Sequence, residues 1–466
     1  MAGSTPPAAS AVWSTRRSAG ALAKGWAGAW KQALRLVSRD HVLSLADQAV
    51  VSGSGFLTTV LIARWSGAGE LGVYAVAASL LGTLLTCQDS LILEPYLIQR
   101  HYPHGTPAER AGASLALSVL FSVGIMAALT IGALACLEWG AGREMMVMTW
   151  AIAGVVPFAL TRQFSRRFAF ARLAFGNALL LDSVVAAIQL AALGWLGASG
   201  RVSALSVFGA LGVAYAAAAG GWLYWARGEF SVRARHVRTV LEQSWALGKW
   251  LLAGQVMVQV QGNIASWLAL AVAGAAVAGV FAACMSVVAF ANPVLAGLGN
   301  SFMPRSVLAW KSGGGPGLWR EAVRNAALIA AAMTPFSLAV LIAGERVMQV
   351  LYPGVEYAGR SHTLTVLALA TFAGAAGWPA SIALATMERP RAIVAVSTVG
   401  AAVAVIFVWV LMTQWGLTGA AYGLLVGNVT GAVGSWAAFS LLLRRRARCE
   451  REQERKDFEP VAQPEQ

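Results

Sequence analysis

Acidic residues are scarce in this 466-residue sequence, which has 21 Asp and Glu against 35 Lys and Arg. Its four cysteines, Cys87, Cys136, Cys284 and Cys449, have no paired spacing, so neither a metal site nor a disulfide framework is expected. The Gly-rich segment at 312–317 lacks the Lys-Ser/Thr of a phosphate-binding loop. We therefore expect no nucleotide site, no metal and no cofactor.

Long apolar runs dominate the chain, of which 58% is hydrophobic and whose mean hydropathy is +0.63. Each of twelve runs is close to the ~20 residues that cross a ~30 Å hydrocarbon layer as a helix. Helices are required because lipid cannot satisfy open backbone groups, and barrel strands would be shorter and alternating. The expected spans are 45–64, 71–93, 113–137, 145–161, 174–196, 203–225, 250–271, 276–299, 326–344, 362–384, 393–412 and 418–442.

Basic residues fall on alternate loops. If residues 1–44 are cytosolic, all but five of the 35 Lys and Arg lie at or beside inner loops and tails, and the positive-inside rule then places both termini in the cytosol. The formal net charge of +14 is explained by these loops beside anionic lipid headgroups, not by nucleic acid. We expect a multi-pass protein of the bacterial inner membrane. The five outer basic residues are Arg64, Arg143, Arg201, Arg346 and Arg360.

The two ends of the chain differ from the spans. The first forty residues are basic and broken by Pro, Gly and Ser, so no cleavable signal peptide is expected. Within the cytosolic segment 1–44, residues 21–37 have the pattern of an amphipathic helix lying in the inner interface. The tail 443–466 is charged and is expected to be solvated or disordered in the cytosol.

The chain contains an internal duplication. Shifting it by 207 residues aligns 45–79 with 252–286, and twelve of these thirty-five positions are identical. Each copy opens a set of six spans, which predicts an N-lobe at 45–225 and a C-lobe at 250–442, joined by a basic inner loop at 226–249. Such parallel repeats are related by a pseudo-two-fold axis along the membrane normal, an arrangement typical of transporters. A duplicated scaffold without a transport role is the alternative.

Span 12 carries glycines at four-residue intervals. Small residues at this spacing form a smooth ridge that allows close helix contact within a membrane. We interpret this ridge as packing; its members are Gly419, Gly423, Gly427 and Gly431.

Three further segments of the sequence are distinctive. They are the opening hairpin "QAVVSGSGFLTTVLIARWSGAGELGVYAVAAS" with "LILEPY" at 91–96, "RQFSRRFAFAR" at 162–172 and "VLYPGVEYAGRS" at 350–361. These segments resemble polysaccharide flippases of the MOP (multidrug/oligosaccharidyl-lipid/polysaccharide) superfamily. The resemblance implies an all-α, MATE-like fold of two six-helix lobes. It also implies translocation of polyprenyl-pyrophosphate-linked oligosaccharide, for export of exopolysaccharide, O-antigen or capsule. Twelve spans argue against the lipid II flippase branch, which carries fourteen.

A polar stripe follows one face of span 1, and a second follows span 7 at matching positions. Lipid-facing amides would be unfavourable, so the stripes are expected to line a central cavity suited to sugar hydroxyls. Hydrogen bonding between helices is the alternative. The two stripes are Gln48, Ser52 and Thr59, and Gln255, Gln259 and Ser266.

Asp182 is the strongest candidate for ion coupling, because it is placed near mid-bilayer in span 5, where carboxylates usually face a cavity or relay. A satisfied hydrogen bond between helices is the alternative. Asp47 is a second candidate, although Ser44 makes a capping-box pattern with it at the start of span 1. Asp89 and Glu94 are close enough to the inner boundary to reach interfacial water.

Basic residues supply the anion-binding candidates. The inner arginines Arg162, Arg166 and Arg167 could receive a lipid-linked headgroup, or could act only as positive-inside anchors. Arg64, at the outer end of span 1, could meet a pyrophosphate or sugar acid in the cavity, or could snorkel.

Two other functions fit the same chain. A cation-coupled multidrug antiporter of the MATE type shares the architecture, but span 7 has no acidic residue. A membrane glycosyltransferase or polysaccharide polymerase would use similar substrates, but the longest outer connection, about 345–361, offers only Glu345 and Glu356 as acids. We therefore expect a transporter, not an enzyme. Its expected partners are the lipid-linked oligosaccharide, anionic membrane lipid and, as candidates, other polysaccharide assembly proteins.

Overall fold

The computed structural model describes residues 39–99, 106–138 and 143–457, and every regular element among them is a helix. The amphipathic segment expected at 21–37 lies outside the described residues. In order, the elements are α2 (Arg39–Gln88), η1 (Asp89–Leu93), α3 (Glu94–Gln99), α4 (Pro107–Glu138), α5 (Arg143–Ala171), α6 (Phe175–Ala198), α7 (Ala204–Ala226), η2 (Arg227–Glu229), α8 (Ala234–Leu268), η3 (Ala269–Ala273), α9 (Ala275–Val288), η4 (Ala289–Ala291), α10 (Asn292–Leu351), η5 (Val355–Tyr357), α11 (Ser361–Thr386) and α12 (Pro390–Asp457).

The twelve membrane-crossing segments come from nine helical stretches, because three of these stretches are bent and cross the membrane twice. Eight helical stretches of the described residues are long and apolar enough to span a bilayer, and α5, with its arginines, adds a ninth of similar length. The backbone leaves the helical region at Gly67 in α2 and at Gly416 in α12, so each of these helices supplies two spans. A third such bend, at Gly314, divides the stretch formed by α9, η4 and α10 into two more. The twelve-span, all-α fold expected from the sequence is confirmed.

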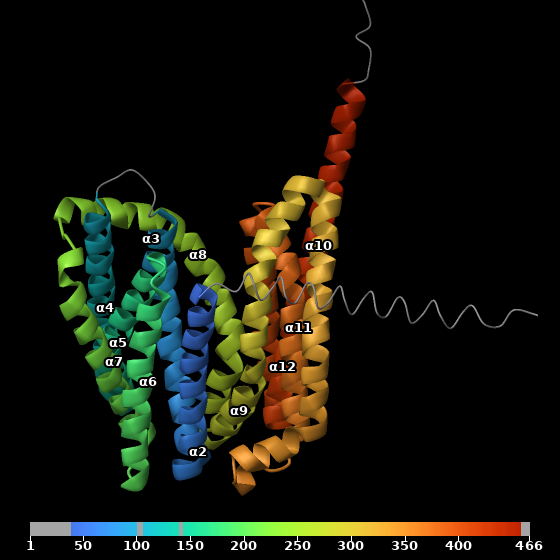
Figure 1. The fold of residues 1–466 in the computed structure, drawn as a ribbon. Coiled ribbons are helices and arrows are strands. Elements are labelled where there is room, and N and C mark those ends of the chain that lie inside the picture. The colour runs from blue at the N-terminus through green and yellow to red at the C-terminus, as the bar shows by residue number, and fades with distance from the viewer. Residues whose placement is uncertain (1–38, 100–105, 139–142, 458–466) are drawn as a thin grey trace, which may run out of the picture.

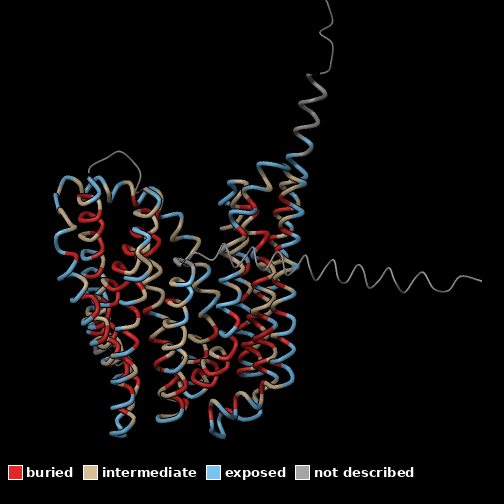
Figure 2. Tube along the Cα trace, viewed as in Figure 1, coloured by how far each residue is buried: buried red, intermediate tan, exposed pale blue. Residues whose placement is uncertain are grey.

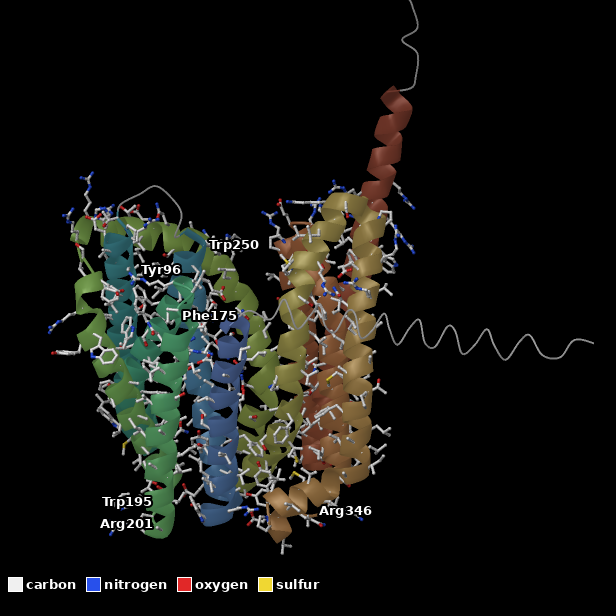
Figure 3. The ribbon with its side chains drawn as sticks, in the orientation of Figure 1. Tyr96, Phe175, Trp195, Arg201, Trp250 and Arg346 are labelled. Atoms are coloured by element: carbon white, nitrogen blue, oxygen red, sulfur yellow. The ribbon has the colours of Figure 1, made fainter. Side chains whose placement is uncertain are left out.

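Figure 1 shows two halves, α2 to α7 on the left and α9 to α12 on the right, with α8 between them. Their ribbons stand apart toward the end where Figure 3 labels Trp250 and meet toward the end where it labels Arg346. We call these the Trp250 end and the Arg346 end. Buried positions gather where the helices of each half face one another, as Figure 2 shows.

Helix α8 belongs to both halves. Near its middle, Gly248 lies against the backbone of Ser90 and Leu91 in the first half. Two turns later, Gly254 faces Val394 of α12 in the second half. Residues 234–249, expected as part of an inter-lobe loop, are therefore helical and pack on the first half.

The glycine ridge of span 12 packs as predicted. A Cβ added at Gly423 would lie 2.4 Å from the Val408 backbone, and one at Gly427 would lie 2.5 Å from the Cβ of Ala404. The two spans of α12 thus pack antiparallel at very close range. Helix α12 also continues to Asp457, so most of the tail expected to be disordered extends this helix.

Candidate site: a buried charge network and a closed end

Helix α5 carries two pairs of polar residues at i, i+4 spacing, which places each pair on one face. Arg162 and Arg166 reach Asp182 of α6, with Arg166 Nε 2.9 Å from Asp182 Oδ2. The Asp182 side chain is fully buried, so this pairing offsets the cost of placing a carboxylate inside the membrane.

Arg166 joins a second carboxylate to the first. Its Nη2 donates to Asp47 Oδ2 at 2.7 Å, and the Asp47 side chain is only 1% exposed. The two residues selected for ion coupling, Asp47 and Asp182, therefore share one guanidinium. Helix α2 begins at Arg39, well before Ser44, so the capping-box interpretation of Asp47 is wrong.

The other pair on α5, Gln163 and Arg167, binds Asp89. Gln163 Nε2 donates to both Asp89 carboxylate oxygens at 3.1 and 2.9 Å, and Arg167 Nη2 donates to Oδ2 at 2.6 Å. Asp89 begins the π-helix η1, a local widening that often occurs at functional positions. Asp89 is buried and paired, so the interpretation that it reaches interfacial water is wrong.

These contacts pair the coupling candidates and the headgroup candidates in two neighbouring clusters along α5, one around Asp47 and Asp182 and the other around Asp89. Three arginines balance three aspartates, and the arginine side chains are 10%, 17% and 30% exposed for Arg162, Arg166 and Arg167. Sequence reasoning missed Gln163 and Tyr215; the ring of Tyr215 lies 5.7 Å from the Arg162 guanidinium carbon. The repeated i, i+4 spacing on α5 was the signal for Gln163. Nothing in the sequence pattern indicated Tyr215.

The aromatic residues between the arginines form core. Phe164 is fully buried and Phe168 is 4% exposed. Both pack against Trp222 and Phe230, with ring centroids between 5.2 and 6.3 Å apart. They hold α5 in register with α7 and thereby position the arginines.

Arg64 connects the two halves at the Arg346 end. Its Nε donates to the Leu351 carbonyl at 3.0 Å, and its Nη2 donates to the Val350 carbonyl. These carbonyls end α10, where the helix dipole favours a cation. The structure thus shows Arg64 bound to protein carbonyls at the Arg346 end.

Other contacts close the same end. Glu356 Oε2 accepts a hydrogen bond from the Ala68 backbone N–H at 3.3 Å. A Cβ added at Gly72 would lie 1.9 Å from the Ala275 carbonyl oxygen, so the two halves touch backbone to backbone. Trp267 of α8 and Ser79 of α2 also join the two halves, since Trp267 Nε1 donates a hydrogen bond to Ser79 Oγ at 2.8 Å.

The polar stripes have mixed surroundings. Gln48 Nε2 donates to Ser52 Oγ at 3.1 Å within α2, and the Thr59 hydroxyl donates to its own helix at the Gly55 carbonyl. Gln259 Nε2 is 3.5 Å from Thr83 Oγ1 across the boundary between the halves. Gln255 and Ser266 are half-buried on α8. Among the described residues, the pair of Gln259 and Thr83 is the hydrogen bond by which a predicted stripe residue bridges the two halves.

Comparison with solved structures identifies the architecture. An inward-facing multidrug resistance MATE family transporter of the MOP superfamily is similar with a TM-score of 0.66 and 13% identity, over 88% of this chain and 96% of that one. The lipid II flippase MurJ in an inward closed conformation gives 0.64 and 13%, over 84% and 86%. A MOP superfamily transporter from Pyrococcus furiosus gives 0.63 and 11%, over 86% and 94%.

The chain has the MATE and MurJ fold. No family model and no curated protein sequence matches it. The likeness extends over most of each chain at very low identity, so it concerns the two-lobe architecture and not the residues of a site. The fold class predicted from the sequence is thereby confirmed.

Proposed function

We propose that this protein is a flippase that moves polyprenyl-pyrophosphate-linked oligosaccharide across the bacterial inner membrane by alternating access. In this proposal both termini are cytosolic, so the Trp250 end faces the cytosol and the Arg346 end faces outward. The two halves then stand apart on the cytosolic side, which is the arrangement that a carrier loading from the cytosol requires. The lipid-linked precursor would enter from that side, where such precursors are assembled.

One observation carries this proposal. Asp47, Asp89 and Asp182 are each bound by an arginine, so these buried acids of the first half are already neutralised by protein partners. The stripes on α2 and α8 contribute amides and hydroxyls instead. A neutral hydrogen-bonding wall suits sugar hydroxyls better than it suits a lipophilic cation.

The anionic headgroup needs a cation on its path. Arg167 has the most exposed side chain of the three network arginines, at 30%, so it is the member that can reach a pyrophosphate while Arg162 and Arg166 hold Asp182 and Asp47. Arg64 would then act as part of the outer closure. Anionic lipid and other polysaccharide assembly proteins are the remaining proposed partners.

Coupling to an ion would act through Asp47 and Asp182. Because the two carboxylates share Arg166, protonation of one would weaken its hold on the guanidinium and transfer that contact to the other. Such an exchange shifts α5 relative to α2 and α6, which is a route from ion binding to lobe movement.

A cation-coupled multidrug antiporter is the second candidate. Buried carboxylates on α2 and α6 are compatible with it, because they would take the coupling ion in either kind of transporter. The two candidates differ in what the chamber carries, and therefore in what a cell lacking the protein accumulates.

The test is deletion of the gene followed by mass analysis of polyprenyl-linked sugars and by dye-efflux assays. Accumulation of a cytosol-facing glycolipid, reversed by the wild-type gene, supports the flippase. Unchanged glycolipids together with reduced dye efflux would replace it with the antiporter. Loss of glycosyl transfer with no build-up of completed glycolipid would instead indicate an enzyme.

A further inference from the structure

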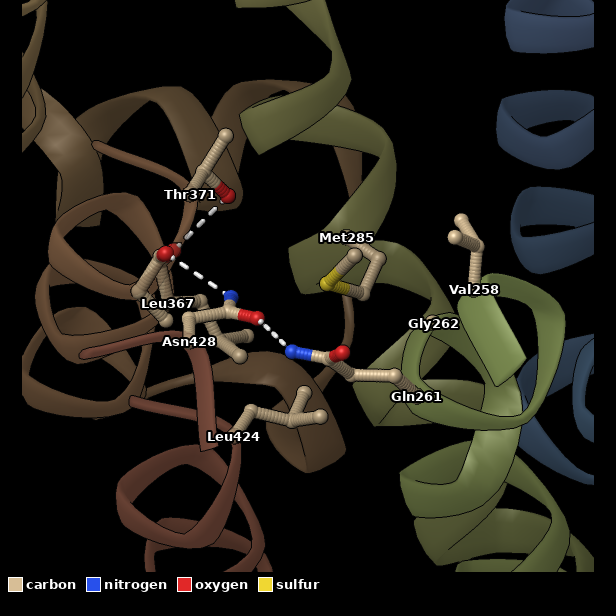
Figure 4. A pocket seen from close by; sticks show the side chains of 9 residues that line it. Val258, Gln261, Gly262, Met285, Leu367, Thr371, Leu424 and Asn428 are labelled. Carbon is tan, nitrogen blue, oxygen red and sulfur yellow. Dashed lines mark hydrogen bonds between the residues drawn. The ribbon is translucent and has the colours of Figure 1, made fainter. Parts of the chain in front are cut away.

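The second half contains a cavity of about 270 Å³ that the polar stripes do not include. It lies among α8, α9, α11 and α12, and Figure 4 shows Gln261, Thr371 and Asn428 around it. Gln261 is two residues beyond Gln259, which turns it about 200° around α8, away from the stripe. The cavity is close to the ~300 Å³ lower limit of common small-molecule sites.

The polar groups in this cavity are held in place. Gln261 Nε2 donates to Asn428 Oδ1 at 2.7 Å, and Asn428 Nδ2 donates to the Ala370 carbonyl at 2.8 Å. The Thr371 hydroxyl donates to the Leu367 carbonyl at 3.0 Å. This series of hydrogen bonds fixes which atoms of the two amide groups are donors and which are acceptors. It leaves the Gln261 carbonyl oxygen, the second hydrogens of both amides and the lone pairs of Thr371 available to a ligand.

Every side chain that lines the cavity is neutral. Apolar surface comes from Val258, Met285, Leu367 and Leu424 beside the amides and the hydroxyl. A mixed wall of amides and aliphatic groups matches a sugar ring, which presents hydroxyls at its edge and C–H groups on its faces. A bare cation or a phosphate would lack a charged partner there.

We infer that this cavity, which we call the amide pocket, binds a neutral sugar residue through Gln261, Asn428 and Thr371. The inference rests on the proposed function, since the sugar would belong to the lipid-linked glycan. It adds a second region of contact, in the second half, for a part of the glycan distant from the charged pyrophosphate.

Gly262 offers a way to fill the amide pocket without disturbing the fold. It lines the pocket, and a Cβ added there meets no atom within 4 Å. Gly262→Leu should therefore extend into the cavity. Gly124 of α4, away from both polar stripes, also has open space around an added Cβ, so Gly124→Leu is a control. Gln261→Met removes the amide while it keeps a long side chain.

The experiment is saturation-transfer NMR on the purified full-length protein in nanodiscs. The probes are glucose, galactose and N-acetylglucosamine, with glucuronate and tetraphenylphosphonium as charged comparisons. We expect at least one neutral sugar to give a signal with the wild type and with Gly124→Leu. We expect that signal to disappear with Gly262→Leu and to weaken with Gln261→Met.

Two results would overturn the inference: no neutral sugar gives a signal with the wild type, or Gly262→Leu keeps the full signal. Either can occur while gene deletion still accumulates glycolipid, and then the flippase stands without this pocket. If the sugar signal depends on Gly262 while deletion leaves glycolipids unchanged, the pocket stands and the proposed function fails.

Discussion

Gly72 of α2 and Gly279 of α9 occupy matching positions of the two repeats and pack against each other's segments. A Cβ on Gly72 would lie 1.9 Å from the Ala275 oxygen, and a Cβ on Gly279 would lie 1.8 Å from the Ala68 oxygen. The contact is therefore reciprocal, as a two-fold relation requires. It brings the backbones of the two halves together at the Arg346 end.

Adding a methyl group at this contact should force the halves apart. Overpacking costs about 1–3 kcal/mol, so Gly72→Ala should shift the equilibrium toward separation at the Arg346 end by roughly five- to 150-fold. The measurement is maleimide labelling of Ala68→Cys, a position only 1% exposed, after replacement of the native cysteines. Gly82→Ala, in open space on the same helix, should leave labelling unchanged. Equal labelling of both variants would contradict the role of this contact.

Arg64 should stabilise the same closure. Arg64→Gln removes a cation from the end of α10, which we expect to cost about 1 kcal/mol because the group is exposed, or roughly a fivefold rise in labelling of Ala68→Cys. The effect should diminish when salt screens the wild-type contact. Arg346→Gln, an exposed arginine at the same end, is the control and should change little. An identical response from both variants would remove Arg64 from the closure.

The ion pairs of α5 should show strong non-additivity. Asp182→Leu leaves Arg162 without a carboxylate partner and should lower the free energy of unfolding by about 3–5 kcal/mol. Adding Arg162→Met removes this stranded charge, while Arg166 keeps Asp47. The double variant should therefore melt at a higher temperature than the single variant. Thermal unfolding in detergent measures both, and additive losses would show that the pairing is energetically unimportant.

The glycine ridge of α12 should tolerate substitution unevenly. Gly427→Leu must displace Ala404 and should lower the yield and melting temperature of the folded protein, since overpacking of a tight helix contact is destabilising. At Gly431 the nearest α8 atom to an added Cβ is Gln261 Nε2 at 4.0 Å, so Gly431→Ala should be accommodated. Size-exclusion chromatography and thermal melting compare the two. Comparable stability of both would argue against the close packing.

The twelve spans could be predicted because length and hydropathy are local properties, and lipid leaves helices as the solution. The duplication could also be read, since twelve identities survive in 45–79 and 252–286. Gly67 and Gly274, identical in that window, share a positive φ of 81° and 89°, a conformation that strongly favours glycine. The sequence thus determined the element types, their number and the relation between the two repeats.

Partner choice was decided by tertiary structure. Asp47, Asp89 and Asp182 are far apart in the chain, and only the packing of α2, η1 and α6 against α5 brings them to the same arginines. Arg64 likewise meets carbonyls almost three hundred residues away. A sequence pattern gives the face on which a side chain lies, but the partner across that face depends on how the helices pack, and long-range packing is not encoded in local spacing.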